Sequence, residues 1–319
     1  MVFDWQPSAS MEALQKRARL LQDVRAFFYA RHFLEVDTPI MSSAGTTDPS
    51  IESVRVTGPD AAPRFLHTSP EFAMKRLLAA GSGDIFQVAK VFREGEAGRF
   101  HNPEFTLLEW YRLGMDHHDL MEEVVGLILH LAGDAADTLS VEKVSYRDLC
   151  RQALAIDPLI ASVSELHQIA VKAGLDIRFE LDRDGWLDLL LSHMVMPSLP
   201  AGQLTLLFDY PASQAALSRI NDDGLTAARF EVFWGGTELA NGFFELQDAD
   251  EQRERFFADN VKRAEAGQLS VPMDDHLIAA LEAGLPECSG VALGLDRLLM
   301  KLTGRRDIQE ILAFPFCNA

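Results

Sequence analysis

The sequence predicts an α+β protein, in which helical segments and paired strands are both prominent. Residues 11–33 carry apolar side chains at helical spacing, and residues 33–40 then read as a short strand closed by proline. Residues 85–112 read as two strands joined by a charged loop that contains glycines and a proline. Residues 229–246 have a similar pattern, with two strands broken at Gly235-Gly236. Helices combined with hairpin-like strands indicate the α+β class.

Composition limits the classes of partner. The 319 residues are enough for one large hydrophobic core or two small ones. The formal net charge is −19, from 48 acidic and 29 basic residues. Nucleic-acid binding depends on Lys and Arg side chains that neutralise phosphates. The acidic balance therefore favours a protein or a small molecule over tRNA as the partner.

Targeting and redox features indicate a cytoplasmic protein. No apolar run approaches the roughly 20 residues that span a bilayer, and the first 20 residues mix apolar with charged side chains, unlike a signal peptide. Cys150, Cys288 and Cys317 are widely spaced and odd in number, so we expect reduced thiols rather than a zinc site or disulfides.

The segment 85–112 carries the clearest candidate chemistry. Alternation in its second strand places Glu109 and Tyr111 on one face, while the opposite face is also apolar, which predicts an interior strand. A buried carboxylate needs a partner, and a cationic ligand would be one. Arg93 ends the first strand, where its guanidinium could bind a phosphate in a bidentate manner. The alternative is an ordinary hairpin with a structural Arg–Glu pair.

Two segments before this hairpin could line a site. Residues 41–60 form a loop rich in Ser, Thr, Gly and Pro, which is typical of site-lining segments. Ser69, Pro70 and Glu71 then lead into an apolar helix, residues 72–80. Pro70 suits a first helical turn and Glu71 the positive helix N-terminus, so capping alone would explain them.

Residues 115–205 read mainly as helices and loops, with helical patterns at 121–131, 162–173 and 182–195. We find no chemistry in this region. Its histidines do not have metal-ligand spacing, so packing or surface exposure is expected for all of them. They are His117, His118, His130, His167 and His193.

The last third of the chain offers a second arginine and two carboxylates. A strand at 290–295 runs into a helix at 296–302. Arg297 lies in the first helical turn, where a cation opposes the helix dipole, and this position is explained if Arg297 faces a polyphosphate. Gly294 would let the backbone approach a ligand closely. In 229–246, strict alternation places Glu238 and Glu245 on opposite faces, so either Asn241-Gly242 forms a bulge or turn, or one carboxylate has another role.

These segments resemble the three motifs of class II aminoacyl-tRNA synthetases, in the form seen in lysyl-tRNA synthetases. Motif 1 corresponds to about 14–40 with its closing Pro39, motif 2 to about 85–112 and motif 3 to about 290–302, and a helical insertion at about 115–205 separates motifs 2 and 3. The resemblance implies one catalytic domain over residues 1–319, with a mixed, mainly antiparallel sheet flanked by helices. In this family motif 1 forms a homodimer interface.

The resemblance also implies roles for individual residues. The catalytic residues would be Arg93 at the α-phosphate and Arg297 at the γ-phosphate, and the adenine would lie between Phe105 and Arg297. Glu238 and Glu245 would hold Mg²⁺. The ATP-binding residues implied are Arg93, Glu94, Gly95, Asn102, Phe105, Glu238, Leu239, Gly294 and Arg297. The amino-acid substrate would contact Ser69, Pro70, Glu71, Glu109, Tyr111, Asn241, Glu245 and Ala292.

Three departures from the family narrow the prediction. Gly95, between Glu94 and Glu96, stands where synthetases usually have the glutamate that reads adenine. This leaves open which carboxylate replaces it, or whether a backbone contact at 94–95 does so. Ala292 stands where lysyl-tRNA synthetases have glycine, and its methyl group should crowd the α-substituents of lysine. We also expect no anticodon-binding domain, since about ten residues precede the first helix.

Together these features resemble the free-standing lysyl-tRNA synthetase paralogues that modify translation elongation factor P. The resemblance implies that ATP activates (R)-β-lysine as its adenylate with release of pyrophosphate, and that a lysine ε-amino group of elongation factor P then accepts it. No tRNA partner is expected. The alternatives are a truncated synthetase that charges a tRNA or a small amine, and a non-catalytic regulatory paralogue. The second is disfavoured because Arg93, Glu238, Glu245 and Arg297 are all present.

Overall fold

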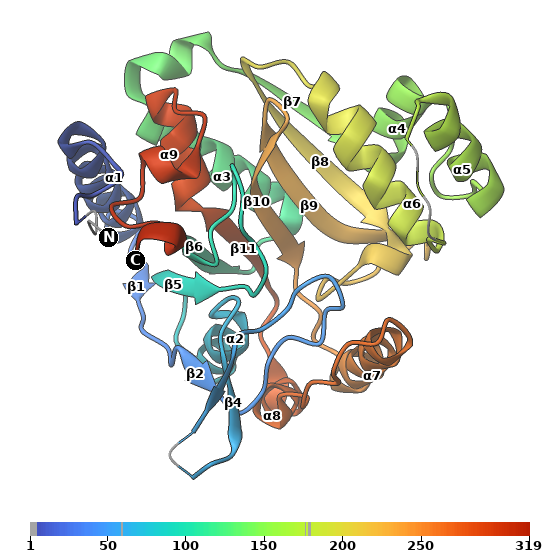
Figure 1. The fold of residues 1–319 in the computed structure, drawn as a ribbon. Coiled ribbons are helices and arrows are strands. Elements are labelled where there is room, and N and C mark those ends of the chain that lie inside the picture. The colour runs from blue at the N-terminus through green and yellow to red at the C-terminus, as the bar shows by residue number, and fades with distance from the viewer. Residues whose placement is uncertain (1–4, 59, 176, 178–179) are drawn as a thin grey trace.

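A twisted sheet forms the centre of the molecule (Figure 1). The computed structural model describes residues 5–58, 60–175, 177 and 180–319. Within them, the sheet has eight strands in the order β1-β5-β6-β11-β10-β9-β8-β7. In that order the strands are β1 (Leu34–Glu35), β5 (Ile85–Phe92), β6 (Glu104–Leu113), β11 (Cys288–Gly294), β10 (Thr237–Phe244), β9 (Thr226–Trp234), β8 (Gln203–Pro211) and β7 (Ser140–Ser145). Only the outer pairs β1–β5 and β7–β8 are parallel, which confirms the predicted mixed, mainly antiparallel sheet.

Two groups of helices pack against this sheet. The main core joins the sheet to α1 (Met11–Tyr29), α3 (His117–Ala132) and α9 (Leu295–Thr303). A second core packs α2 (Glu71–Ala79), α7 (Ala249–Glu265) and α8 (Asp275–Gly284) against one end of β5, β6 and β11. The side chains of β6 show the division, because Leu108 and Trp110 belong to the main core while Tyr111 belongs to the second. Alternate β6 side chains are therefore buried on opposite faces.

The predicted insertion is mostly helical. It contains α4 (Tyr146–Leu154), α5 (Val163–Lys172) and α6 (Arg183–Leu190), which continues as a π-helix at Leu191–Val195 and a 3₁₀ turn at Met196–Ser198. Its strand β7 was not predicted, because four of its six side chains are exposed and no apolar alternation marks it. A small separate sheet has the order β2 (Met41–Ser42), β4 (Pro63–Leu66) and β3 (Arg55–Thr57).

The predicted motif segments form the expected elements, with two differences. β5 and β6 pair as an antiparallel hairpin, and β6 lies between β5 and β11, so the prediction of an interior strand is confirmed. The strand predicted over residues 33–40 is reduced to the two residues of β1. The helix predicted to reach residue 33 ends at Tyr29, and His32 beyond it has a left-handed backbone, with φ of 63°. Among the described residues, no helix combines the length and apolar character that crossing a membrane requires.

Candidate active site

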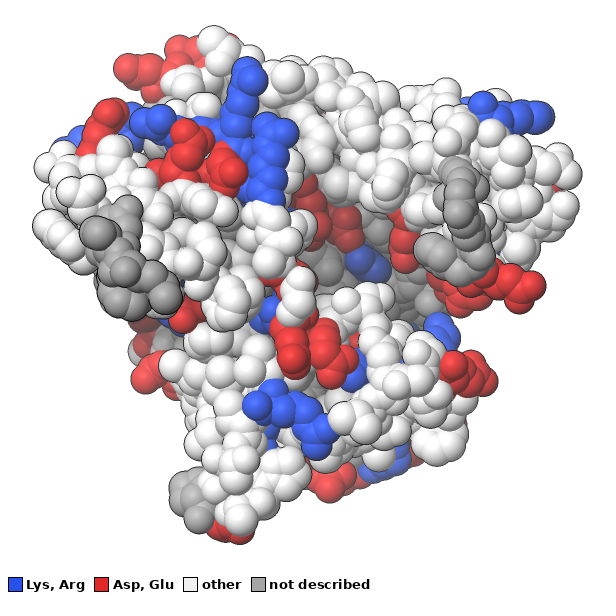
Figure 2. Space-filling view, viewed as in Figure 1, with Lys and Arg blue, Asp and Glu red and all other residues white. Residues whose placement is uncertain are grey.

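A cavity of about 750 Å³ opens over one face of the sheet. Its walls come from the loop at residues 41–51, the start of α2, the hairpin loop between β5 and β6, β9, β10, and the junction of β11 with α9. The insertion helix α6 and α7 also contribute. Figure 2 shows acidic and basic side chains gathered around a hollow in the middle of this face. The cavity thus collects the predicted motif residues from distant parts of the chain.

Arg297 projects into this cavity from the first turn of α9. Its Nη1 donates to the Glu238 carbonyl at 3.1 Å and lies 3.5 Å from the Glu238 carboxylate, and its Nη2 is 2.7 Å from Nε2 of His101. The neighbouring Asp296 is buried and accepts hydrogen bonds from Arg17 at 2.5 Å and from the Thr106 backbone N–H at 2.7 Å. Asp296 therefore fixes α9, and with it Arg297, relative to β6.

Arg93 lies just beyond β5 and lines the same cavity. Its guanidinium lies 5.1 Å from the centre of the Phe105 ring and 3.5 Å from the Glu96 carboxylate. Its buried Nε has no hydrogen-bond partner within the described part of the chain. Burial lowers the pKa of His101, and the charges of Arg297 and Arg93 lower it further. The charges of both guanidinium groups therefore act on one imidazole, at the place where a polyanion was predicted.

The loop between β5 and β6 clarifies the adenine prediction. Glu96 lines the cavity, whereas Glu94 and Gly95 are exposed and are not among its lining residues. Of the two carboxylates left open by the sequence, Glu96 is thus the one placed to contact a ligand. Asn102 lines the cavity, but its Nδ2 donates to the Glu104 carbonyl at 2.6 Å and its Oδ1 accepts from the Phe316 N–H at 2.9 Å. Asn102 therefore holds the loop against the C-terminal segment.

A β-bulge in β10 determines where the carboxylates of this strand point. The pairing with β9 shifts between Glu238 and Ala240, so the bulge lies nearer the start of the strand than the Asn241-Gly242 step considered in the sequence. Glu238, Leu239 and Asn241 line the cavity. The added residue brings Glu238 to the same face as Asn241.

The predicted Mg²⁺ pair of Glu238 and Glu245 needs correction. The two residues lie seven positions apart along an extended segment, about 20 Å at the rise of a strand. Glu245 is buried and its carboxylate pairs with Lys75, whereas Glu238 faces Arg297. The two carboxylates therefore cannot hold the same ion. Glu231 on β9 is the nearer partner, because it lines the cavity and the charge of Glu238 helps raise its pKa to about 7, after the larger effect of burial.

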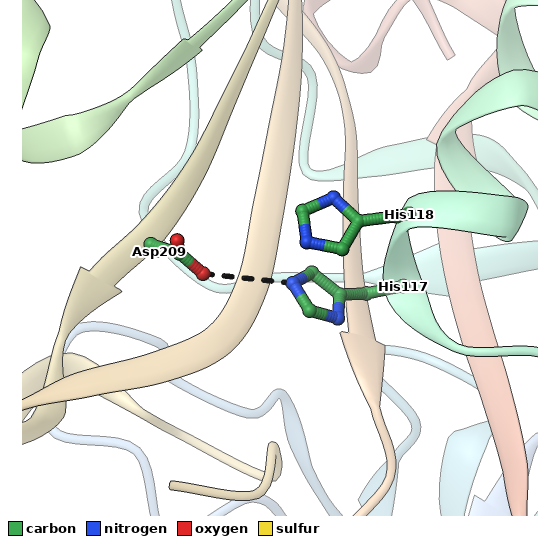
Figure 3. Close-up of side chains that lie close together, drawn as sticks. All are labelled: His117, His118 and Asp209. Carbon is green, nitrogen blue, oxygen red and sulfur yellow. Dashed lines mark ion pairs between the residues drawn. The ribbon is translucent and has the colours of Figure 1, made fainter. Parts of the chain in front are cut away.

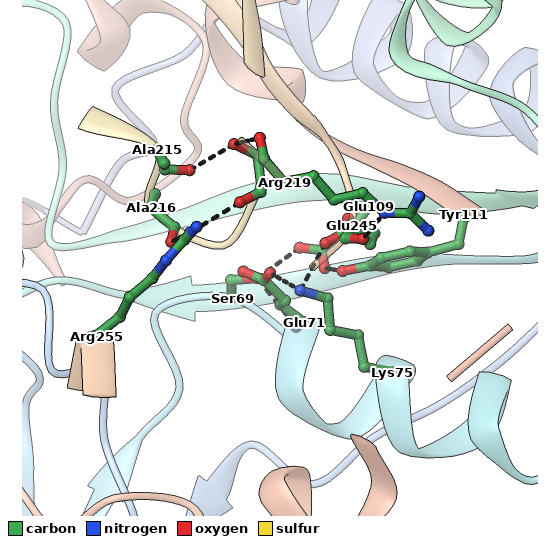
Figure 4. A network of polar contacts seen from close by, with 11 residues as sticks. Ser69, Glu71, Lys75, Glu109, Tyr111, Ala215, Ala216, Arg219, Glu245 and Arg255 are labelled. Atoms are coloured by element: carbon green, nitrogen blue, oxygen red, sulfur yellow. Dashed lines mark hydrogen bonds and ion pairs between the residues drawn. The ribbon is translucent and has the colours of Figure 1, made fainter. Parts of the chain in front are cut away.

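A buried ionic network lies behind the wall formed by α2 (Figure 4). The ammonium group of Lys75 lies between two carboxylates, 2.7 Å from Glu71 and 2.6 Å from Glu245. The side chains of Lys75 and Glu245 are 2% and 1% exposed, while Glu71 reaches the cavity. Burial alone would lower the pKa of Lys75, but Glu245 and Glu71 outweigh it and the pKa is raised. Lys75 is therefore a fixed internal cation.

Glu109 lies in the same network and has a separate set of donors. Ser69 Oγ donates to Glu109 Oε2 at 2.5 Å, and the Tyr111 hydroxyl donates to Oε1 at 2.8 Å. Burial raises the pKa of Glu109 to about 8, and the charge of Glu71 adds to this effect. Burial also raises the pKa of Tyr111 well above its usual value, which keeps the phenol a neutral donor.

The network is short of positive charge. It contains three carboxylates, Glu71, Glu109 and Glu245, and one ammonium group, that of Lys75. Burial raises the pKa of Glu109 and of Glu245, and a nearby ammonium group would favour their charged forms, so this wall suits a ligand that carries ammonium groups. Asn241 and Ala292 line the adjoining part of the cavity, as predicted for substrate residues.

Gly290 on β11 lies directly against this network. An added Cβ there would lie 2.3 Å from the Tyr111 ring and 2.5 Å from the Glu245 carboxylate. At Gly294, by contrast, an added Cβ would meet no atom closer than 3.8 Å. The space above Gly294 is therefore open to a ligand, whereas that above Gly290 is filled by the protein.

Part of the loop predicted over residues 41–60 lines the cavity, while residues 41–42 and 55–57 form strands β2 and β3. Residues 41–51 line the cavity, and the buried Arg263 of α7 donates to the carbonyls of Asp48 at 3.1 Å and Ile51 at 3.3 Å. Arg263 also pairs with Glu52 at 2.6 Å. Its guanidinium therefore supplies hydrogen-bond donors to loop carbonyls that are not paired within a helix or a sheet.

The insertion contributes acidic groups that the sequence did not single out. Asp184 and Asp188 on α6 line the cavity together with motif residues that are far from them in the sequence. Asp184 accepts from Ser213 at 2.7 Å, and Asp188 accepts from Gln214 at 2.8 Å. Burial raises the pKa of Asp188 to about 6.

Comparison with known proteins agrees with the motifs. A family model described as tRNA synthetases class II (D, K and N) matches residues 2–318. A Vibrio cholerae protein named elongation factor P–(R)-beta-lysine ligase is 50% identical over 326 residues, which cover 99% of each chain. Proteins with the same name from Pseudoalteromonas translucida and Proteus mirabilis are 49% and 46% identical, and at least 98% of every chain is covered.

Proposed function

Because the chain belongs to the class II tRNA synthetase family of the D, K and N type, we propose that it is an ATP-dependent ligase that activates (R)-β-lysine and transfers it to translation elongation factor P. The observation that carries the proposal is the buried network with excess carboxylates beside a cavity that also holds Arg93 and Arg297. A substrate with two ammonium groups is complementary to the carboxylates of the network, and a triphosphate is complementary to Arg93 and Arg297. The names of the relatives supply the identity of the acceptor and the enantiomer.

In the first reaction, a carboxylate oxygen of β-lysine attacks the α-phosphorus of ATP. The bond between the α-phosphorus and the bridging oxygen to the β-phosphate breaks, and pyrophosphate leaves. Arg93 stabilises the charge at the α-phosphate and Arg297 that at the γ-phosphate, with Phe105 and Arg297 on either side of the adenine. Such a reaction requires positioning and charge stabilisation, and no protein nucleophile.

Mg²⁺ fits the cavity at Glu238, with Glu231 in place of the Glu245 expected from the sequence. Both side chains line the cavity, and carboxylates beside phosphate oxygens are suitable Mg²⁺ ligands. The ion would supply positive charge to the phosphates. Arg229 pairs with Glu231 at 2.5 Å and so sets the orientation of that carboxylate.

The β-lysine ammonium groups are expected at the wall formed by Ser69, Pro70 and Glu71. Glu71 is the carboxylate of the network that reaches the cavity, and Glu109 lies directly behind Ser69. Ala292 pairs with Glu109 across β11 and β6, so its methyl group lies near these carboxylates. That methyl group would disfavour an α-ammonium and leave room for a β-ammonium.

In the second reaction, the lysine ε-amine of elongation factor P attacks the carbonyl carbon of the adenylate. An amide bond forms, the bond from carbon to the phosphate oxygen breaks, AMP leaves and the amine loses a proton. Asp184 and Asp188 are the acidic groups on the insertion side of the cavity, where a lysine side chain from another protein would be attracted. Their position supports transfer to a cationic protein side chain.

Mass spectrometry of elongation factor P tests this function. After incubation with the enzyme, ATP and (R)-β-lysine, one lysine should gain the mass of a lysyl residue. Parallel reactions with tRNA should give no charged product. Unmodified elongation factor P together with charged tRNA would identify a truncated synthetase instead, and loss of both products would favour a regulatory protein.

The acceptor side can be tested separately from activation. The double substitution Asp184→Asn, Asp188→Asn should leave ATP–pyrophosphate exchange near the wild-type rate and slow transfer to elongation factor P by about tenfold, a rough figure for removing charge that steers a partner. Equal losses in both assays would place these residues in activation. The substitution Asp134→Asn, on an exposed turn outside the cavity, is the matched control.

We also propose a homodimer formed through the motif 1 segment, in the cytoplasm. This segment carries exposed apolar side chains, among them Tyr29, Leu34 and Ile40. Exposed apolar groups at a short edge strand are typical of an interface. Light scattering should give twice the chain mass, and Leu34→Asp should shift the protein towards the monomer.

A further inference from the structure

A group of metal-ligand side chains lies outside the cavity, between α3 and β8. His117 and His118 are the first two residues of α3, and Asp209 lies near the end of β8. One ligand atom from each lies within 4.8 Å of the others, and the three side chains point toward one another (Figure 3). The sequence predicts no metal site here, because adjacent histidines match no usual ligand spacing and the carboxylate comes from a distant strand.

His117 gives the group a feature that packing alone leaves unexplained. The residue is 6% exposed, and neither of its ring nitrogens has a hydrogen-bond partner among the described residues. Its Nε2 lies 3.6 Å from Oδ1 of Asp209, which is beyond hydrogen-bond distance. A buried imidazole without a partner is unfavourable, and a cation held by both groups would remove this cost.

Asp209 is held in place for such a role. It lies where the pairing of β8 with β9 shifts between Phe208 and Tyr210, and its backbone is left-handed, with φ of 57°. The side-chain amide of Asn221 donates to Asp209 Oδ1 at 2.9 Å. A hydrogen bond from a neighbouring residue that orients a ligating carboxylate is a common feature of metal sites. The bulge and the amide therefore aim Asp209 at the histidines.

His118 completes the group from the solvent side. Its ring contacts the Phe208 ring at 5.2 Å between centres and the His117 ring at 4.1 Å. Lys143 is the nearby cation that would oppose a metal ion, but it pairs with Glu122 on α3. Because His118 is exposed and Asp209 is half-buried, a fourth ligand position is open to water.

We propose that His117, His118 and Asp209 bind one divalent transition-metal ion, with Zn²⁺ as the expected occupant. Two imidazoles, one carboxylate and a water form a usual tetrahedral zinc set, whereas Mg²⁺ prefers oxygen ligands. The ion would tie the first turn of α3 to β8, at the place where the insertion begins and where the chain returns to the sheet. None of the three residues lines the cavity, so this site is separate from the proposed Mg²⁺ site.

Equilibrium zinc binding to untagged, chelator-treated protein tests the proposal. In competition with a chromophoric chelator, the wild type should bind one Zn²⁺ per chain. The double substitution His118→Ala, Asp209→Asn should weaken this binding by about 100-fold or more, since it removes two of three ligands. His193→Ala, which changes an exposed histidine elsewhere in the insertion, should bind Zn²⁺ as the wild type does. Equal stoichiometry and affinity in the wild type and the double variant would overturn the proposal.

Two further measurements keep the test independent of the variant's folding. Co²⁺ added to the wild type should give the intense visible absorption of a tetrahedral site, whereas weak octahedral absorption would contradict the proposed geometry. Zn²⁺ should also raise the melting temperature of the wild type by a few degrees, roughly as expected for ligand linkage. An unchanged melting temperature in saturating Zn²⁺ would count against an ion that ties α3 to β8.

Discussion

The proposed phosphate side of the cavity, around Arg93 and Arg297, and its proposed amino-acid side, around Glu71 and Lys75, are built in different ways. On the phosphate side, Arg297 is 23% exposed and its nearest carboxylate contact, to Glu238, is 3.5 Å. On the amino-acid side, Lys75 and Glu245 are almost fully buried and pair at 2.6 Å. Guanidinium groups stay charged in any surroundings, so the phosphate side can remain loosely paired and open to a ligand. The charge of a carboxyl group depends on its surroundings, so the function of the amino-acid side depends on the partners of its carboxyl groups inside the protein.

The largest effect is expected on the phosphate side. Arg297→Ala should reduce ATP–pyrophosphate exchange by about 10²- to 10³-fold, because one preorganised charge at the developing phosphate charge is lost. Folding should be intact, since Arg297 contributes no buried ion pair. Exchange rates and circular dichroism give the two readouts. Arg253→Ala on the exposed face of α7 serves as the control, and near-wild-type exchange in the Arg297 variant would show that the nucleotide binds elsewhere.

On the amino-acid side, the expected effect of a substitution is on the free energy of unfolding. Lys75→Met removes the ammonium group that pairs with both Glu71 and Glu245, so the free energy of unfolding should fall by about 3 kcal/mol or more. Urea unfolding measures this loss. The exposed Lys172→Met, on α5, is the control and should change stability little.

The pH dependence of the Lys75 variant sharpens the comparison. Burial already raises the pKa of Glu245 to about 7, and loss of Lys75 removes the main opposing charge. A raised carboxyl pKa gives stability that is present below the unfolded pKa and is lost as the pH rises through the folded pKa. The variant should therefore be less destabilised at pH 5 than at pH 8. An equal deficit at both values would mean that Glu245 is not the group left unpaired.

The same contrast explains how far the sequence could predict the site. Arg93, Glu71 and Arg297 line the cavity as their motifs implied, because each lies at the end of a strand or the start of a helix that the local pattern predicts. Lys75 was missed because it lies in a helix that reads as apolar, although its place one turn after Glu71 was a usable signal.

The remaining differences depend on tertiary structure. A bulge in β10 turns Glu238 to the face that carries Asn241, and no sequence pattern fixes the position of a bulge within a strand. Asp184 reaches the cavity from the insertion, which carries no recognisable chemistry of its own. Strand β7 likewise lies beside β8 in the eight-stranded sheet, although no apolar alternation in its sequence predicts a strand.

Glu109 allows a smaller, titrating effect to be measured. Burial raises its pKa to about 8, so between about pH 5 and pH 8 the folded protein binds a proton that the unfolded chain has lost. This group should make the free energy of unfolding fall as pH rises, by up to about 1.4 kcal/mol per pH unit. Glu109→Gln should flatten that slope in urea unfolding. The exposed Glu104→Gln should not, and an unchanged slope in the first variant would assign the titration to another group.

The smallest expected effect concerns selectivity between two isomers of lysine. The Ala292 methyl group lines the cavity on β11, directly across from Glu109 on β6, and it differs from glycine by a single carbon atom. One such group changes discrimination by about 1–3 kcal/mol, so Ala292→Gly should shift the ratio of pyrophosphate exchange with β-lysine to that with α-lysine by about tenfold toward α-lysine. The shift should come mainly from improved use of α-lysine, because the methyl group is expected to crowd its α-ammonium rather than to bind β-lysine. Ala89→Gly, which changes a buried alanine of β5 outside the cavity lining, controls for lost packing. If Ala292→Gly instead weakens the use of both isomers equally, the methyl group packs the cavity floor, and selection between the isomers must come from the carboxylates Glu71 and Glu109.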